Sequence, residues 1–152
     1  MSRLEVSFQL ISKENYELAF KLQTACHSFP WSRGQFQGCL DEPYFCFQMC
    51  RGDAVLGYYV GLSASVEVTL MDIGIAKKER GKGLGRELLK HFLREANKRQ
   101  AEEAWLEVRV SNEPAIHLYR EMAFEEIETR KDYYPTAEGK EDALIMRLIL
   151  GR

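Results

Sequence analysis

The fold is decided around one stretch of the chain, Arg80-Gly81-Lys82-Gly83-Leu84-Gly85-Arg86. It follows an apolar run that ends in Asp72-Ile73-Gly74-Ile75 and therefore predicts a strand before it. After it, apolar residues recur at helical spacing: Leu84, Leu88, Leu89, Phe92, Leu93 and Ala96. A helix start offers free N–H groups and roughly +0.5 charge, and glycines let a ligand approach the backbone. With Arg80, Lys82 and Arg86 alongside, the stretch predicts an anion site suited to phosphate.

Several phosphate motifs compete for this turn. A Walker A string, GxxxxGK[ST], does not occur in the chain. The dinucleotide fingerprint GxGxxG fails because its third glycine falls one residue early, with Arg86 at the required place. The pattern Arg-x-x-Gly-x-Gly is satisfied by Arg80, Gly83 and Gly85. Taken alone, these residues also fit an ordinary glycine-rich surface loop.

A second strand and helix follow, with polar groups at their junction. Alternation along residues 104–110 puts Leu106 and Val108 on one face and Glu107 on the other. Glu107 is either a functional carboxylate or a partner of Arg109 on a solvated face. In the same way, Asn112 fits an N-cap and Tyr119 fits a half-buried core aromatic.

The remaining elements complete a mixed α/β sheet. We expect strands at residues 4–10, 45–51, 54–61, 66–75, 104–110, 124–130 and 142–150. We expect helices from Ser12 to Cys26, from Ser32 as N-cap to about Leu40, from Leu84, and from Asn112 to Met122. The order β-α-α-β-β-β-α-β-α-β-β predicts an antiparallel first half and a βαβ unit in the second half.

Length and composition limit the class of protein. The 152 residues predict a single domain spanning 1–152, and 45% hydrophobic residues exclude global disorder. The net charge of −2 disfavours a dedicated nucleic-acid binder. Neither a membrane-spanning run nor a signal peptide is apparent, so we expect a cytoplasmic protein with no membrane contact. Four cysteines without a CxxC pair predict buried thiols and no metal site.

The motifs together resemble the GNAT family of N-acetyltransferases over almost the whole chain. The resemblance rests on the Arg80 turn and on the string Glu107-x-Arg109-x-x-Asn112-x-x-Ala115-Ile116-x-Leu118-Tyr119 with Met122-Ala123-Phe124. Four further segments resemble the branch that acetylates protein N-termini: Phe29-Pro30-Trp31-Ser32, Trp105-Leu106-Glu107-Val108-Arg109, Tyr133-Tyr134-Pro135-Thr136 and Glu141-Asp142-Ala143. The resemblance implies a central mixed β-sheet flanked by helices.

The resemblance also implies an activity and its residues. Acetyl would pass from acetyl-CoA to the N-terminal α-amine of a protein, with the N-terminal alanine of ribosomal protein bS18 as the expected acceptor. It implies Glu107 as general base and Tyr119 as general acid. The implied cofactor contacts are Ile73, Gly74 and Ile75 for the acetyl-pantetheine arm, Arg80, Gly81, Lys82, Gly83, Leu84, Gly85 and Arg86 for the pyrophosphate, and Asn112.

Aromatic and acidic residues are candidates for the acceptor site. Trp31, Tyr133 and Tyr134, with Phe29, are candidate walls of a peptide groove, although Phe29 and Trp31 equally fit core packing. We expect Tyr134 in an exposed loop because Pro135 follows it. Asp142, with Glu107 and Glu141, would attract a cationic N-terminus.

Other functions stay open at this stage. The same core would serve an enzyme that acetylates lysine side chains or a small-molecule amine. A non-catalytic acetyl-CoA sensor is disfavoured because Glu107 and Tyr119 are both present. We assign no role to His27, His91 or His117, which lack partners at catalytic spacing.

Overall fold

The computed structural model describes residues 5–151. Its strands are β1 (Ser7–Leu10), β2 (Tyr44–Arg51), β3 (Ala54–Ala64), β4 (Glu67–Ile75), β5 (Glu103–Arg109), β6 (Glu125–Thr136) and β7 (Gly139–Ile149). Its helices are α1 (Glu17–Cys26), α2 (Arg33–Gln37), α3 (Leu84–Lys98) and α4 (Glu113–Glu121), with a short 3-10 turn η1 (Lys77–Glu79). The order of strands and α-helices matches the one predicted from the sequence.

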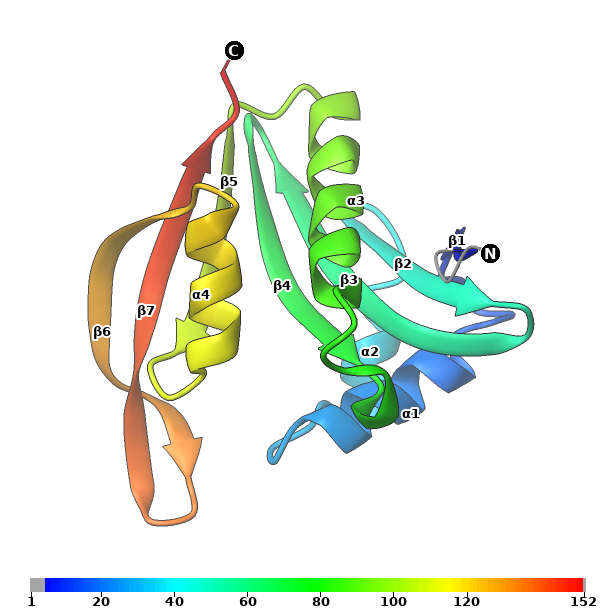
Figure 1. Cartoon of the computed structure of the whole chain (residues 1–152), viewed down its shortest axis with the longest axis horizontal. Helices are drawn as coiled ribbons and strands as arrows, with labels where there is room; N and C mark the ends of the chain where they lie inside the picture. The colour runs from blue at the N-terminus through cyan, green and yellow to red at the C-terminus, as the bar shows by residue number, and fades with distance from the viewer. Residues whose placement is uncertain (1–4, 152) are drawn as a thin grey trace.

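The strands form one mixed sheet in the order β1-β2-β3-β4-β5-β7-β6. Neighbouring strands are antiparallel except β4 and β5, which are parallel and flank α3 in the chain. Figure 1 shows β4 and β5 side by side at one end and apart at the other. The predicted mixed sheet with a βαβ unit is confirmed.

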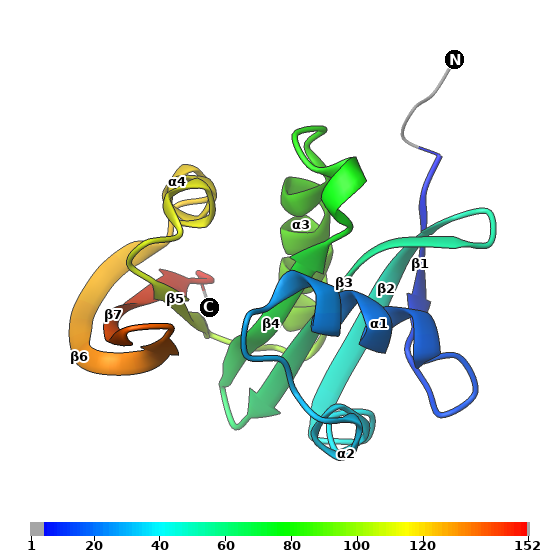
Figure 2. The ribbon, with the colours of Figure 1, turned by 90° about the horizontal axis from the view of Figure 1, so that it is seen from below.

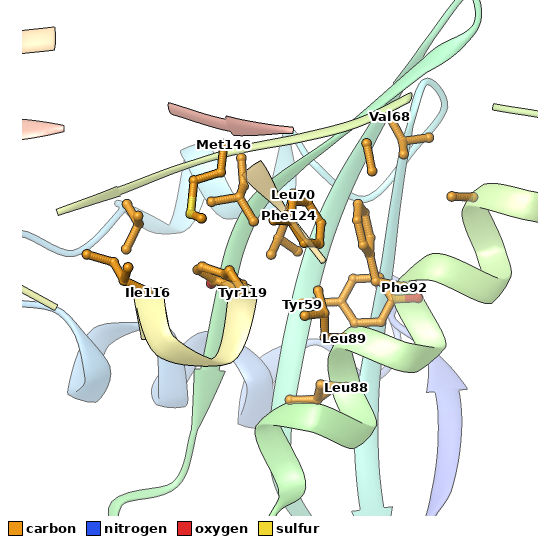
Figure 3. Packing of buried hydrophobic residues seen from close by; sticks show 14 of the residues in the cluster. Tyr59, Val68, Leu70, Leu88, Leu89, Phe92, Ile116, Tyr119, Phe124 and Met146 are labelled. Atoms are coloured by element: carbon orange, nitrogen blue, oxygen red, sulfur yellow. The ribbon is translucent and has the colours of Figure 1, made fainter. Parts of the chain in front are cut away.

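Helices cover the two faces of the sheet differently. α3 and α4 lie on one face, and α1 and α2 lie on the other, over β2 to β4 (Figure 2). The larger core lies under α3 and α4, where Leu88, Leu89 and Phe92 meet Tyr59 of β3 (Figure 3). A smaller cluster around Phe36 and Tyr58 lies under α1 and α2. Within residues 5–151, no helix covers the face of β5, β7 and β6 opposite α4 (Figure 2).

Element boundaries follow local chemistry. Ser32 is the N-cap of α2 and forms a capping box with Gln35, as its position predicted. The expected continuation of this helix to Leu40 is wrong, because the helix ends at Gln37 with Gly38 as C-cap. β1 begins at Ser7 rather than at the predicted Leu4, which lies outside the described residues. β6 runs on to Thr136, well past the predicted end at Arg130.

Candidate active site

The site is built where β4 and β5 separate. Leu70 pairs with Gly61 of β3 and Asp72 pairs with Val60, so Met71 is an extra residue on β4. Such a bulge bends the strand and ends regular pairing. The parallel pairing with β5 stops at Leu70, before the predicted acetyl-binding residues Ile73 to Ile75. Among residues 5–151, no strand therefore pairs with β4 on its β5 side beyond this point.

Glu107 projects from β5 beside this separation. Its neighbours Leu106 and Val108 are buried in the core under α4, as predicted, whereas Glu107 is half-buried on the opposite face. Arg130 Nη1 lies 3.3 Å from Glu107 Oε2. A hydrogen bond with Glu107 also raises the pKa of Tyr133, ahead of a smaller effect of burial. The carboxylate is thus held by two side chains of β6.

Tyr119 approaches the separation from α4. Its side chain is 5% exposed and packs against Phe124 (Figure 3). Burial raises the pKa of this phenol, and the charge of Asp72 and the nearby Tyr134 raise it further. A phenol with a raised pKa keeps its proton at neutral pH. The influence of Asp72 on Tyr119 also means that α4 and the bulged end of β4 lie within electrostatic reach of each other.

An irregular bulge in β6 carries Tyr133 and Tyr134. Arg130 pairs with Ala143 and Tyr134 pairs with Glu141, so three residues of β6 stand opposite one residue of β7. Asp142 is that residue, and its Oδ1 accepts a hydrogen bond of 3.0 Å from the N–H of Asp132. Asp142, a predicted substrate contact, thereby stabilises the conformation of the bulge. The expected loop at Tyr134 is wrong, because Tyr134 lies half-buried in the strand, whereas Tyr133 is 44% exposed.

Arg109 fixes the other side of Tyr134. Its guanidinium lies 4.6 Å from the centroid of the Tyr134 ring and donates to the Pro135 carbonyl at 2.9 Å. It also forms an ion pair of 3.0 Å with Glu141, whose Oε1 accepts the N–H of Ser111. Burial, and then the charge of Glu107, raises the pKa of Tyr134 to about 12. Tyr134 is therefore a neutral hydroxyl at the edge of the site.

The predicted acetyl-binding segment of β4 is tightly packed on its α1 side. A Cβ on Gly74 would stand 2.6 Å from Tyr58 Cε1, so only glycine fits there. The Ile73 N–H donates to Asp72 Oδ1 at 2.9 Å, and the Ile75 carbonyl accepts from Arg80 Nε at 3.2 Å. Cys26 Sγ also contacts that carbonyl, at 3.5 Å. Side chains from α1, from β4 itself and from the glycine-rich turn therefore contact the backbone of this segment.

The glycine-rich turn adopts the backbone that only glycine favours. Gly81 and Gly83 have φ of +79° and +82°, and Gly83 is the N-cap of α3 with no side-chain cap hydrogen bond. Gly83 thus offers no side-chain acceptor to the first N–H groups of α3. Gly85 has room for a Cβ, with Leu118 Cδ2 at 3.5 Å, and Leu84 is buried in the core. The turn leaves backbone donors exposed at a helix start.

The basic residues predicted at this turn have protein partners. Lys82 Nζ pairs with Glu79 Oε1 at 3.1 Å, and Arg86 forms an ion pair with Glu121 of α4. Arg80 contacts the Ile75 carbonyl and, at 3.7 Å, Cys26 Sγ. These three cations surround the turn and are oriented by acidic groups or carbonyls.

Two further predicted residues have structural contacts. Asn112 is the N-cap of α4, where its Oδ1 accepts the N–H of Ala115 at 3.3 Å. Trp31 packs against Phe36, and its N–H donates to Gln23 Oε1 at 2.9 Å. The nearby Phe29 is 49% exposed. Trp31 thus belongs largely to the core under α1 and α2, and Phe29 is the aromatic of this loop that faces outward.

A cluster of His27, Asp72 and Tyr58 also lies at the site, and it was not predicted from the sequence. His27 Nε2 lies 2.8 Å from Asp72 Oδ1, and the Tyr58 hydroxyl donates to Asp72 Oδ2 at 2.8 Å. These residues come from the end of α1, from β4 and from β3. The available sequence signal was that Asp72 interrupts an apolar strand, which is unusual for a buried position.

Two kinds of feature are absent from the described residues. Within residues 5–151, no group of three or more His, Cys, Asp or Glu side chains is arranged to hold a metal ion. No helix in the same range has the length and apolar character to cross a membrane.

Comparison with known proteins identifies the class. The acetyltransferase (GNAT) family matches residues 12–124. Over 130 residues the chain is 38% identical to the [ribosomal protein bS18]-alanine N-acetyltransferase of Escherichia coli strain K12, which covers 86% of this chain and 88% of that protein. The crystal structure of the ribosomal-protein-S18-alanine N-acetyltransferase from Escherichia coli superposes with a TM-score of 0.92 at 34% identity, over 97% of this chain and 95% of the other.

A more distant structure shares the fold alone. It is a GNAT family acetyltransferase from Elizabethkingia anophelis with acetyl-CoA bound, with a TM-score of 0.81 at 14% identity, over 97% of this chain and 100% of the other. The chain belongs to the GNAT family of acetyltransferases, and the resemblance seen in its sequence is confirmed.

Proposed function

We propose that this acetyltransferase transfers acetyl from acetyl-CoA to the N-terminal α-amine of a protein. The observation that carries the proposal is the separation of β4 and β5 after Leu70, with the Glu107 carboxylate of β5 held by Arg130 and Tyr133 of β6. The uncapped start of α3 at Gly83 supports it. Acetyl-CoA supplies an activated thioester, and the similarly folded enzyme from Elizabethkingia anophelis holds it. Residues of this chain then bind the amine and transfer its protons.

The residues present fit a coenzyme A group. The backbone at Gly81 and Gly83 leaves N–H donors directed outward from α3, with no Cβ to obstruct a pyrophosphate. The free side of β4 from Ile73 to Ile75 suits an extended amide-bearing arm, because peptide-like amides pair with an unpaired strand edge. Arg80, Lys82 and Arg86 supply positive charge around the turn.

Glu107 and Tyr119 have the properties of a base and an acid. The half-buried Glu107 carboxylate accepts the proton of the attacking amine, either directly or through water. The buried Tyr119 phenol keeps its proton until a thiolate leaves, because its pKa is raised. An α-amine has a pKa of ~7.7–8.0 against ~10.4 for lysine, so a carboxylate deprotonates an α-amine more easily. This difference favours an N-terminal acceptor.

The acceptor groove that we propose lies on the helix-free face of β5 and β7. Tyr133 and Tyr134 form one wall, held by Asp142 and Arg109, and the loop with Phe29 and Trp31 forms the other. The relative from Escherichia coli is named for the N-terminal alanine of ribosomal protein bS18, and we propose the same acceptor here. With a ribosomal protein as acceptor, we propose that the enzyme acts in the cytoplasm.

Thiol release from acetyl-CoA, with mass spectrometry of the acceptor, tests the proposal. Three acceptors are compared: a short peptide with a free N-terminal alanine, its N-blocked counterpart containing lysine, and a polyamine. We expect acetylation of the free α-amine alone. Turnover on the blocked peptide or the polyamine instead would replace the proposal with a lysine or small-amine acetyltransferase.

A further inference from the structure

The cluster of His27, Asp72 and Tyr58 stands on the strand segment assigned to the acetyl group. Asp72 is the first residue after the β4 bulge, and its side chain is 6% exposed. Its Oδ1 accepts from His27 Nε2 at 2.8 Å and from the Ile73 N–H at 2.9 Å, and its Oδ2 accepts from Tyr58. The carboxylate is held by three donors and therefore has one orientation.

This carboxylate sets the tautomer of His27. A carboxylate only accepts hydrogen bonds, so the proton of a neutral His27 ring lies on Nε2 and leaves Nδ1 as a base. Among the described residues, no hydrogen bond engages Nδ1. The His27 side chain is 35% exposed, so the ring has access to solvent. A buried aspartate that orients an imidazole in this way also stabilises the imidazolium that forms when the base takes a proton.

The position of His27 relates it to the residues that we propose for acetyl transfer. The adjacent Cys26 contacts the Ile75 carbonyl at 3.5 Å, so the end of α1 lies along the free segment of β4. After the larger effect of burial, the charge of Asp72 also raises the pKa of Tyr119 and of Tyr134. Asp72 and Glu107 lie on the same face of the sheet, one on each side of the separation.

We propose that His27 is a further catalytic residue, which takes the first proton from the acceptor ammonium while Asp72 holds its ring. The inference rests on the proposed function. An ammonium must lose two protons before it becomes an amide. His27 Nδ1 takes the first and releases it to water. As the N–C bond forms and the C–S bond breaks, Glu107 takes the second proton and Tyr119 gives its own to sulfur. Transfer from Glu107 to Tyr119 through water then restores both groups.

The charges around His27 favour this role. Asp72 of β4 and the Tyr58 hydroxyl of β3 face the ring, and Cys26 precedes it. Arg80 lies 3.7 Å from Cys26 Sγ and is the nearby cation among these contacts. An imidazole is a stronger base than a carboxylate, so it is the better partner for the first proton of an ammonium.

The test compares His27→Gln with wild type, with His117→Gln as the control. His117 is an exposed histidine of α4, with 75% of its side chain accessible. We measure kcat/KM for the α-amine peptide from about pH 6 to about pH 9, together with acetyl-CoA affinity and Tm. For His27→Gln we expect a loss of about tenfold near pH 7, where about a tenth of the α-amine is already neutral, and a smaller loss towards pH 9, where nearly all of it is neutral. Acetyl-CoA affinity stays unchanged, and His117→Gln behaves as wild type.

Asp72→Asn provides the second variant, because it is nearly isosteric and keeps an acceptor for the Ile73 N–H. We expect the same pH-dependent loss, and a double variant no worse than His27→Gln alone. A loss that is equal at every pH, or a wild-type profile in both variants, overturns the role of His27. If wild type acetylates only lysine or a polyamine, the proposed function fails, and the same variants on that amine still decide the role of His27. If wild type acetylates none of the three, both proposals fail.

Discussion

Arg130 Nη1 lies 3.3 Å from Glu107 Oε2, although the two residues are 23 positions apart in the chain. The arginine sits at the start of the β6 bulge, and its guanidinium lies 5.5 Å from the centroid of the Tyr133 ring. The segment that presents the tyrosine wall therefore also holds the candidate base. If Tyr133 and Tyr134 bind the acceptor as we propose, this single strand irregularity couples acceptor binding to the position of the carboxylate.

Glu107→Gln removes the base while keeping a similar shape. We expect kcat to fall by about 10²–10⁴-fold, with acetyl-CoA affinity little changed. Glu128→Gln is the matched control, because Glu128 also pairs with Arg130, at 3.7 Å, and is 58% exposed. Steady-state kinetics with the alanine peptide and calorimetric binding of acetyl-CoA measure both quantities. Equal activity of the two variants would exclude Glu107 as the base.

Tyr119→Phe removes one hydroxyl from a buried ring. Because burial and Asp72 raise the pKa of Tyr119, we expect the phenol to stay protonated, and its loss to slow turnover, across the neutral range. The peptide KM should stay near its wild-type value, since the ring and its contact with Phe124 remain. Tyr16→Phe is the control, because it also removes one tyrosine hydroxyl. The Tyr16 hydroxyl lies before α1 and accepts a hydrogen bond from Arg33. A wild-type rate for Tyr119→Phe from about pH 6 to about pH 9 would remove its role as the acid.

Local patterns made much of this site predictable from the sequence. Alternation in β5 placed Glu107 opposite the core, and the caps at Ser32 and Asn112 followed from residue type and spacing. Each of these signals lies within a few residues of the group that it positions. Short-range physical chemistry is therefore enough to find them.

The remaining features depend on contacts that are distant in sequence. His27 and Asp72 are 45 residues apart and meet only because α1 packs across β4. Tyr134 looked like a loop residue before Pro135, but pairing with Glu141 draws it into β6. Tertiary pairing overrides the local turn signal there, which is the usual reason that strand ends are misjudged.

Asp142→Ala releases the bulge that carries the tyrosines. The lost hydrogen bond from the Asp132 N–H involves a carboxylate, and such bonds contribute about 1.5–3 kcal/mol. We expect the peptide KM to rise by about tenfold or more, while acetyl-CoA affinity stays the same. Asp53→Ala in the β2–β3 turn serves as the control. A raised acetyl-CoA Kd with an unchanged peptide KM would contradict the role that we give to Asp142.

Gly83→Ala tests the glycine-rich turn against a matched glycine elsewhere. Gly83 and Gly52 both have positive φ, +82° and +61°, and a Cβ on either meets nothing within 4 Å. Each substitution therefore costs about 1–2 kcal/mol of backbone strain and should lower Tm similarly. Only Gly83→Ala should also weaken acetyl-CoA binding, because Gly83 caps α3. Equal acetyl-CoA affinity in the two variants would show that the turn does not hold the cofactor.

Glu95→Gln probes the ion cluster that fixes α3 and has a defined pH dependence. Burial alone would raise the pKa of Glu95, but hydrogen bonds from Arg99 and Lys98 outweigh it, and the pKa is lowered. A lowered folded-state pKa means that the carboxylate contributes stability above its unfolded pKa of ~4.3, and that this contribution is lost as pH falls through the folded value. We expect Glu95→Gln to reduce the free energy of unfolding by about 1.5–3 kcal/mol at pH 7, because Arg99 donates to Glu95 Oε1 at 2.6 Å. The difference from wild type should shrink when urea unfolding is measured at about pH 3.5, below that reference value.

The control is Glu87→Gln. Its ion pair with Lys90 spans 3.8 Å, so its loss should have little effect at either pH. A penalty for Glu95→Gln of the same size at both pH values would contradict the stabilising role that we give to the ionised carboxylate.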